Sequence, residues 1–218
     1  MCRLLRCLCG GGGRQSDDVA LPPQTFRSQI GKTVPATVVR EGRLLGYNTD
    51  AAGFITPLRE LYGSLKDARC AVLGAGGAAR ACLWALHREG AECTVFARNP
   101  EKAGPLARAF GIDCRQIANS GFGDFDVVIN STPLGTRGMT EDETAAAVDQ
   151  LRGVRLAYDL VYNPTETRFL RAARDAGCRT LGGMEMLLSQ ALEQFRLWTG
   201  REPDANVMRA SALAKLNG

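Results

Sequence analysis

The sequence RCAVLGAGGAAR, residues 69–80, places a glycine-rich turn between an apolar run and an alanine-rich run. The apolar run Arg69–Leu73 predicts a buried strand, and the segment Ala78–Glu89 predicts a helix. Between them, GAGGAA has the form G-x-G-x-x-A. Its first glycine permits a tight turn, its second lets backbone amides approach a pyrophosphate, and its small third residue lets helix and strand pack closely. Such runs also serve simple close packing, but this position between a strand and a helix favours a dinucleotide site.

The phosphates of the dinucleotide are expected at the start of that helix, where free backbone amides and the helix dipole favour negative charge. The residues expected to hold them are Gly74, Ala75, Gly76, Gly77 and Ala78.

Strand-like and helix-like segments alternate along the rest of the chain. Strands are expected at 92–96, 126–130, 156–161 and 179–181, and helices at 101–110 and 167–176. This alternation predicts an α/β fold, namely a Rossmann-like, doubly wound parallel sheet with helices on both faces and right-handed crossovers.

Two short strands are expected upstream of this unit, at 37–40 and 43–47, around a tight turn at Glu41-Gly42. Beyond Asp50 the apolar residues recur at helical spacing until Gly63. This spacing predicts one helix of modest length, with Asp50 as its N-cap.

The last clear amphipathic helix is expected at 184–198, and Gly200 should end it. Its apolar stripe comprises Met184, Leu187, Leu188, Ala191, Leu192, Phe195 and Trp198. Met186, Gln190 and Gln194 form a neighbouring row four residues apart, so we expect Gln190 beside the buried face rather than within it.

The composition indicates a soluble globular protein. The chain has 218 residues, of which 45% are hydrophobic and 23% charged, and its net charge is +4. These values exclude collagen-like, coiled-coil and wholly disordered proteins. No apolar run approaches the roughly 20 residues that cross a bilayer, and the arginines are scattered, so neither a membrane span nor nucleic-acid binding is expected.

Five of the eight cysteines lie singly in aliphatic or mixed stretches, which predicts free thiols and a reducing, cytoplasmic location. The other three, Cys2, Cys7 and Cys9, crowd the N-terminus without a CxxC pair. The spacing is poor for zinc and a fourth ligand is missing, so no metal site is expected. Residues 1–29 read as an irregular or disordered segment, a linker or a mis-assigned start.

The residues after the second strand of the dinucleotide unit indicate which nucleotide binds. An NAD site places Asp or Glu there to accept hydrogen bonds from the ribose. Here the strand runs into Ala97-Arg98-Asn99-Pro100-Glu101-Lys102 instead. Two cations, Arg98 and Lys102, suit a 2′-phosphate, so NADP is predicted as the cofactor. The alternative is that both are solvated surface charges.

Several further motifs occur in one order and carry a family resemblance. They are GYNTDAAG (46–53), the glycine loop (74–80), NSTPLG (130–135), DLVYNP (159–164) and GMEMLLSQ (183–190). With these motifs the chain resembles the C-terminal two-thirds of shikimate dehydrogenase. The resemblance implies reversible, NADP-linked reduction of 3-dehydroshikimate to shikimate in chorismate and aromatic amino-acid biosynthesis.

The resemblance also implies roles for single residues. A Lys and an Asp form the catalytic pair of the family, and Asp50 matches the Asp, although Asp before a helix is more often only a cap. Positions matching substrate contacts are Asn48, Tyr162 and Gln190. Positions matching the cofactor site, besides the glycine loop, are Ala97, Arg98, Asn99, Lys102, Asn130, Ser131, Thr132, Leu160 and Gly183. For these loop residues the alternative is simple turn chemistry.

The N-terminal substrate lobe of the family is almost wholly missing from the pattern, and its catalytic Lys is missing with it. Residues 30–49 resemble a remnant of that lobe, 50–200 the NADP-binding domain with its return helix, and 201–218 a helical segment packing near the substrate side. Lys32 is a candidate replacement for that Lys, and the alternative is that it is only a solvated charge before a strand. The alternatives are a catalytically inactive NADP-binding module and a quinate dehydrogenase. A substrate lobe in cis or a homodimer could complete the site.

Overall fold

The computed structural model describes residues 36–40, 43–118 and 120–217. The expected turn at Glu41-Gly42, the N-terminal cysteines, Lys32 and the segment 1–29 lie outside these residues. In the described part of the chain, no helix is both long and apolar enough to cross a membrane.

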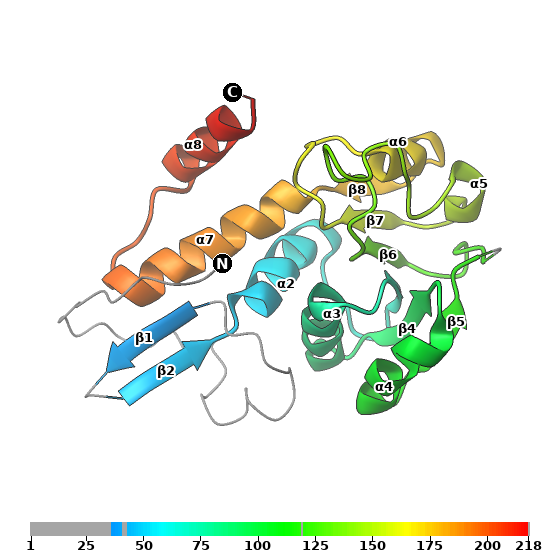
Figure 1. Ribbon diagram of the computed structural model, residues 1–218, viewed down its shortest axis with the longest axis horizontal. Helices are drawn as coiled ribbons and strands as arrows, with labels where there is room; N and C mark the ends of the chain where they lie inside the picture. The colour runs from blue at the N-terminus through cyan, green and yellow to red at the C-terminus, as the bar shows by residue number, and fades with distance from the viewer. Residues whose placement is uncertain (1–35, 41–42, 119, 218) are drawn as a thin grey trace.

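A six-stranded parallel sheet forms the centre of the molecule, in the order β5-β4-β3-β6-β7-β8 (Figure 1). The strands are β3 (Arg69–Leu73), β4 (Glu92–Ala97), β5 (Asp113–Gln116), β6 (Val127–Asn130), β7 (Leu156–Asp159) and β8 (Arg179–Leu181). The chain runs outward from β3 to β5 and then returns to the other side of β3 with β6. This reversal is the topological switch point at which doubly wound folds bind their ligands, and it confirms the predicted fold class.

Helices cover both faces of the sheet, because successive side chains of the buried strands point to opposite sides. Cys70 and Val72 pack on the face covered by α2 (Thr49–Tyr62), α3 (Gly77–Arg88) and α4 (Pro100–Phe110). Ala71 and Leu73 pack on the face covered by α5 (Val148–Leu151) and α6 (Arg168–Asp175). The five cysteines of this region are free thiols, as the sequence predicts.

Three features of the sheet differ from the sequence predictions. The strand expected at 156–161 ends at Asp159, because the next residues turn into a loop. The sequence does not predict strand β5, since DCRQ has no apolar pattern. It lies at the edge of the sheet, where three of its four residues are exposed. Helix α5 is a single turn, which is too short to show a helical periodicity in the sequence.

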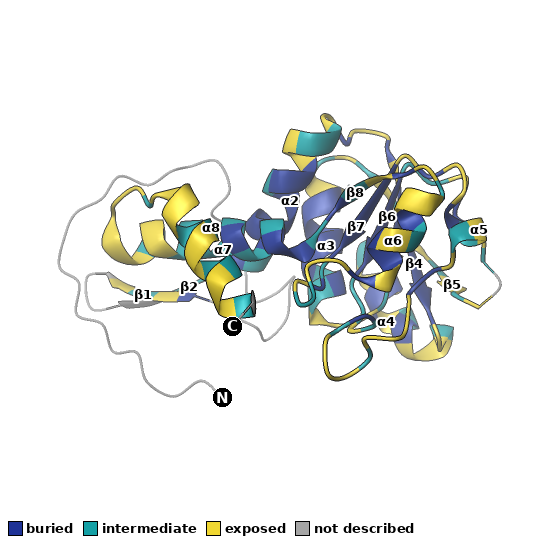
Figure 2. Cartoon of the chain, turned by 90° about the horizontal axis from the view of Figure 1, so that it is seen from above, coloured by how far each residue is buried: buried dark blue, intermediate teal, exposed yellow. Residues whose placement is uncertain are grey.

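The N-terminal strands form a separate antiparallel pair, β1 (Ala36–Arg40) and β2 (Arg43–Tyr47), as expected. Helix α7 (Gly183–Thr199) reaches from the sheet to this pair, where the Trp198 indole Nε1 donates to the Thr37 carbonyl oxygen at 3.2 Å. Helix α8 (Ala205–Asn217) packs on α7 and has no buried residue among those described (Figure 2).

Helix α7 lies along α2, and Met184 and Leu188 of its predicted apolar stripe are buried. The row of Met186, Gln190 and Gln194 contacts α2, whereas Phe195 and Trp198 at the end of the stripe are 37% and 39% exposed. Asp50 and Thr49 of α2 accept hydrogen bonds at this contact, and the two glutamines of the row supply the donors.

Candidate active site

The glycine loop joins β3 to α3 at the switch point. Gly74 has a φ of +109°, and its amide donates to the Phe96 carbonyl oxygen of β4 at 2.8 Å. A Cβ at this position would lie 2.9 Å from Ser131 Oγ, so both the backbone conformation and the space require glycine here.

The space beyond the loop is open. A Cβ at Gly76 or Gly77 would meet no atom of residues 36–40, 43–118 and 120–217 within 4 Å. Gly76 precedes α3, which has no side-chain cap and no acidic residue in its first turn. Its first backbone amides are therefore available to an anion. Ala75 is exposed and Ala78 half-buried in the same loop, so the predicted phosphate residues do come together.

The end of β4 carries the two predicted cations. Arg98 and Lys102 are exposed, and within residues 43–118 and 120–217 neither forms an ion pair. Ala97 is buried, and Asn99 Oδ1 caps α4 by accepting from the Lys102 amide at 3.1 Å. Two exposed cations beside this glycine loop fit the 2′-phosphate and pyrophosphate of NADP.

The loop after β6 forms the opposite wall. The Ser131 amide and hydroxyl both donate to the Leu73 carbonyl oxygen, at 2.9 and 2.7 Å. Asn130 Oδ1 accepts from the amide and the hydroxyl of Thr132, at 3.0 and 2.6 Å. The Leu160 amide donates to the Asn130 carbonyl oxygen at 3.0 Å, which joins this loop to the one after β7. The structure thus brings these predicted residues together.

Gly183 begins α7 directly against the loop after β7. A Cβ there would lie 2.5 Å from the Leu160 carbonyl oxygen and 2.6 Å from the Val161 carbonyl carbon. No side chain could occupy that space without moving the loop. Tyr162, the next residue of the loop, is 46% exposed, so its phenol is accessible.

Asp50 does not cap its helix, contrary to the sequence prediction. Asn48 is the N-cap of α2, and its Oδ1 accepts from the amides of Asp50 and Ala51 at 2.9 and 3.2 Å. Asp50 is instead the second residue of α2. Because Asn48 does the capping, the Asp50 carboxylate is left for another role. The acceptor oxygen of Asn48 is in turn occupied, and its amide nitrogen remains as a donor.

The Asp50 carboxylate meets Gln190 across the contact between α2 and α7. Gln190 Nε2 donates to Asp50 Oδ1 at 2.9 Å, and one turn further along α7 Gln194 Nε2 donates to Thr49 Oγ1 at 2.9 Å. Burial raises the pKa of Asp50. The two predicted residues, Asp50 and Gln190, are 140 positions apart in sequence and adjacent in space.

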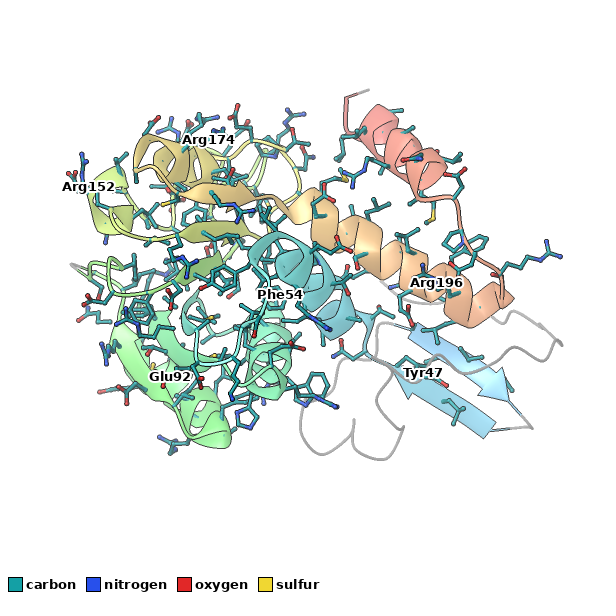
Figure 3. The ribbon with its side chains drawn as sticks, turned by 180° about the vertical axis from the view of Figure 1, so that it is seen from behind. Tyr47, Phe54, Glu92, Arg152, Arg174 and Arg196 are labelled. Carbon is teal, nitrogen blue, oxygen red and sulfur yellow. The ribbon has the colours of Figure 1, made fainter. Side chains whose placement is uncertain are left out.

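Helix α2 is held on the sheet by Phe54, which stacks on Tyr158 of β7 with ring centroids 5.2 Å apart and planes 9° apart. Figure 3 shows Phe54 where α2 lies over the sheet. This stacking fixes the depth at which the first turn of α2 presents Asp50.

Sequence reasoning missed one polar residue of this region. Asp159 is fully buried at the end of β7 and accepts hydrogen bonds from Asn130, Val161 and Thr167. An Asp at the end of a buried apolar strand could have pointed to this residue, because a buried carboxylate needs hydrogen-bond partners.

Comparisons with known proteins agree with this geometry. A family model described as shikimate / quinate 5-dehydrogenase matches residues 58–165, and one described as shikimate 5′-dehydrogenase C-terminal domain matches residues 183–213. A shikimate dehydrogenase (NADP(+)) from Oleidesulfovibrio alaskensis is 42% identical over 196 residues, which are 87% of this chain and 70% of that protein.

Solved structures show the same similarity. A shikimate dehydrogenase in complex with NADP+ has a TM-score of 0.80 and 32% identity, covering 86% of this chain and 68% of that one. A shikimate 5-dehydrogenase from Thermus thermophilus, in complex with NADP(H) and shikimate, has a TM-score of 0.76 and 36% identity. That comparison covers 85% of this chain and 69% of the other.

Proposed function

The chain belongs to the shikimate dehydrogenase family, and from this we propose that it interconverts 3-dehydroshikimate and shikimate with NADP(H) as its cofactor. The single observation that carries the proposal is the half-buried Asp50–Gln190 pair, whose side-chain atoms are 2.9 Å apart. When bound, NADPH supplies a hydride to the carbonyl carbon of the substrate, and NADP+ accepts it in the reverse direction.

Asp50 is assigned the proton-transfer role. In the reducing direction the carbonyl oxygen must gain a proton, and in the oxidising direction the alcohol must lose one. Burial raises the pKa of Asp50, so its carboxyl holds a proton to higher pH than an exposed Asp does. Gln190 orients the carboxylate by donating to Oδ1. Within the described residues, Oδ2 receives no hydrogen bond and is available to a substrate hydroxyl.

Three polar side chains are proposed substrate contacts. Asn48 offers its amide nitrogen, because capping already occupies its oxygen. Gln190 offers its carboxamide oxygen, since its nitrogen binds Asp50. The exposed phenol of Tyr162 offers a donor and an acceptor.

The cofactor is proposed to lie across the edge where β3, β4 and β6 end. The amides at the start of α3 would hold the pyrophosphate, and Arg98 with Lys102 would hold the 2′-phosphate. Gly74, Ser131 and Thr132 would line the path between the two nucleotides, and Leu160 with Gly183 would lie beside the nicotinamide. With its free thiols, the protein is expected to work in a reducing, cytoplasmic environment.

The catalytic Lys of the family has no counterpart in the matched motifs. We therefore propose that full turnover needs a substrate lobe in cis, placed over the β1–β2 pair and the start of α2. In that arrangement Asp50 is the acid–base residue that the described part of the chain contributes.

The function is tested by mixing the protein with NADP+ and shikimate and following the near-ultraviolet absorbance of the reduced nicotinamide. We expect NADPH to form, more slowly than with a substrate lobe present, and we expect Asp50→Asn to lower kcat by at least about 100-fold. Asp124→Asn, at an exposed loop position, is the matched control and should be neutral. An Asp50→Asn variant as active as the control would contradict the assigned role.

The same assay separates the alternatives. An inactive NADP-binding module would raise its melting temperature with NADPH and show no turnover. A quinate dehydrogenase would turn over quinate faster than shikimate. Neither alternative is supported by the comparisons better than shikimate dehydrogenase is.

A further inference from the structure

Asp159 ends strand β7 with no exposed surface, and both of its carboxylate oxygens accept hydrogen bonds. Oδ1 accepts from Asn130 Nδ2 at 2.9 Å and from the Val161 amide at 3.0 Å. Oδ2 accepts from the Thr167 hydroxyl at 2.5 Å. The three donors come from three different segments: the end of β6, the loop after β7, and the start of α6.

Backbone amides fix the direction of the side-chain bonds in this network. The Thr132 amide donates to Asn130 Oδ1, so the Asn130 nitrogen must point at Asp159. The Leu170 amide donates to Thr167 Oγ1, so the hydroxyl hydrogen of Thr167 is free to point at Asp159. Three donors therefore point at the side chain of residue 159, and both of its oxygens must act as hydrogen-bond acceptors.

Only the ionised carboxylate leaves both oxygens free to accept from those donors. Burial raises the pKa of Asp159 to about 6, against the effect of its three hydrogen bonds, which lower it. The groups that face the carboxylate are the Thr167 hydroxyl, the Val161 amide and the Asn130 carboxamide, and among the described residues no charged group contributes to the shift. Above about pH 6 the fold keeps a buried negative charge that holds these loops, and no cation of the described residues lies beside it.

Two of the segments that donate to Asp159, the loops after β6 and β7, flank the proposed nicotinamide position. Val161 lies between Leu160 and Tyr162, and its carbonyl is in close contact with Gly183 at the start of α7. Asn130 orients Thr132 and also donates to the Leu134 carbonyl oxygen at 3.3 Å. A change at Asp159 would thus be transmitted to both walls of that pocket.

We propose that Asp159 is a positioning residue for the nicotinamide half of NADP(H), acting through the Asn130–Thr132 loop and the Leu160–Tyr162 loop. The inference rests on the proposed function, since it takes NADP(H) as the ligand. It goes further in assigning a role in cofactor geometry to a buried carboxylate that contacts neither substrate nor cofactor.

The test compares two ligands on each variant. NADPH carries both nucleotides, whereas adenosine 2′,5′-bisphosphate carries the adenine half and its phosphates without the nicotinamide. Asp159→Asn keeps the shape of the side chain but replaces one acceptor oxygen with a donor. We expect its dissociation constant for NADPH to rise about tenfold or more, and that for adenosine 2′,5′-bisphosphate to stay within about twofold.

The matched control is Asp126→Asn. Asp126 also ties two segments together, since its Oδ2 accepts from the Arg69 amide at 2.9 Å, but it lies at the opposite end of the sheet, before β6. This variant should leave the binding of both ligands unchanged. If Asp126→Asn also weakened the binding of NADPH but not that of adenosine 2′,5′-bisphosphate, the effect would be general to the sheet. The inference would then be overturned.

A second pair of variants guards against failure of Asp159→Asn to fold. Thr167→Val removes the hydroxyl that donates to Asp159, and Thr167→Ser keeps it. We expect the Val variant to bind NADPH more weakly, with its affinity for adenosine 2′,5′-bisphosphate unchanged, and the Ser variant to bind both ligands normally. A general packing role for this position would instead make Val, which keeps the shape of Thr, the better-tolerated residue.

The outcomes are distinguishable. Selective loss of NADPH in Asp159→Asn and Thr167→Val supports the inference. Unchanged binding of both ligands, or equal loss of both, overturns it and leaves the proposed function standing. If the unmodified protein binds neither ligand, the proposed function fails, and the inference that rests on it fails too.

Discussion

Tyr158 buries its phenol hydroxyl in the core, and within the described residues this oxygen has no hydrogen-bond partner. A buried hydroxyl without a partner costs about 1–3 kcal/mol. Tyr158→Phe keeps the stacking on Phe54 and removes that cost. We expect the free energy of unfolding, measured by urea denaturation, to rise by about 1 kcal/mol or more.

The matched control for this change is Tyr62→Phe. The Tyr62 hydroxyl accepts from Arg155 Nη1 at 3.0 Å, so its removal breaks a hydrogen bond. We expect that variant to be unchanged or slightly less stable. A loss of stability in Tyr158→Phe would mean that its hydroxyl does find a partner in solution.

Asp159 gives the stability of the protein a pH dependence. Its pKa rises from an ordinary 3.8 to about 6 on folding, so the folded chain binds the proton more tightly than the unfolded chain does. The stability that this proton brings is fully present below the unfolded pKa and is lost as the pH rises through about 6. The shift corresponds to about 3 kcal/mol.

We therefore expect the stability difference between the unmodified protein and Asp159→Asn to fall by about 3 kcal/mol between about pH 3 and about pH 7. Urea unfolding of both proteins across this range measures it, and the subtraction cancels the other titrating groups. A difference that grew with pH would show that Asp159 is stabilised as a carboxylate by more than burial costs it.

The contact between α2 and α7 depends on a glycine. A Cβ at Gly53 would lie 2.2 Å from Gln190 Cγ and 3.0 Å from the Met186 carbonyl oxygen. Gly53→Ala must therefore push the helices apart or displace Gln190 from Asp50. We expect kcat/KM in the shikimate assay to fall by about tenfold or more, and the free energy of unfolding to fall by about 1–3 kcal/mol.

Gly104→Ala is the matched control, since Gly104 also lies inside a helix, α4, where the nearest atom to a new Cβ is the flexible end of Arg108 at 3.0 Å. There the higher helix propensity of Ala should stabilise the protein by up to about 1 kcal/mol and leave kcat/KM unchanged. Equal effects of the two substitutions would contradict a special role for the α2–α7 contact.

The elements show what sequence alone can and cannot predict. Strands β3, β6 and β7 are predictable because their apolar runs are buried on both faces. Edge strand β5 is not, because exposure at the sheet edge removes any need for an apolar pattern. The inner face of α7 is predicted in part, since Met184 and Leu188 of the apolar stripe are buried. The polar row beside the stripe hydrogen-bonds to α2, and only the tertiary contact shows that pairing.

The candidate site shows the same division. The glycine loop and the cations after β4 follow from local sequence, because a strand, a turn and a helix start impose them. The capping of α2 does not, since both Asn48 and Asp50 are good N-cap residues and only the backbone geometry selects Asn48. The partners of Asp159 come from three separate segments, so no local pattern could reveal them.

At the scale of the whole molecule, the chain has a well-buried sheet and a more exposed extension. Strands β3, β6 and β7 are covered on both faces, whereas among the described strands β1 and β2 pair only with each other. Trp198, which is 39% exposed, joins the extension to α7 through its hydrogen bond to Thr37. Local opening of the β1–β2 pair should therefore cost far less free energy than opening of the sheet.

Trp198→Phe tests this division, because it keeps an aromatic ring at the contact and removes the indole donor to Thr37. Amide hydrogen exchange should accelerate in β1 and β2 by about fivefold, as expected for the loss of about 1 kcal/mol of hydrogen bonding, and should not change in β3, β6 or β7. The unmodified protein should already exchange faster in β1, β2 and α8 than in the sheet. Equal acceleration in the sheet would mean that the extension and the sheet unfold as one cooperative unit, in which case the β1–β2 pair would be as firmly held as the cofactor domain itself.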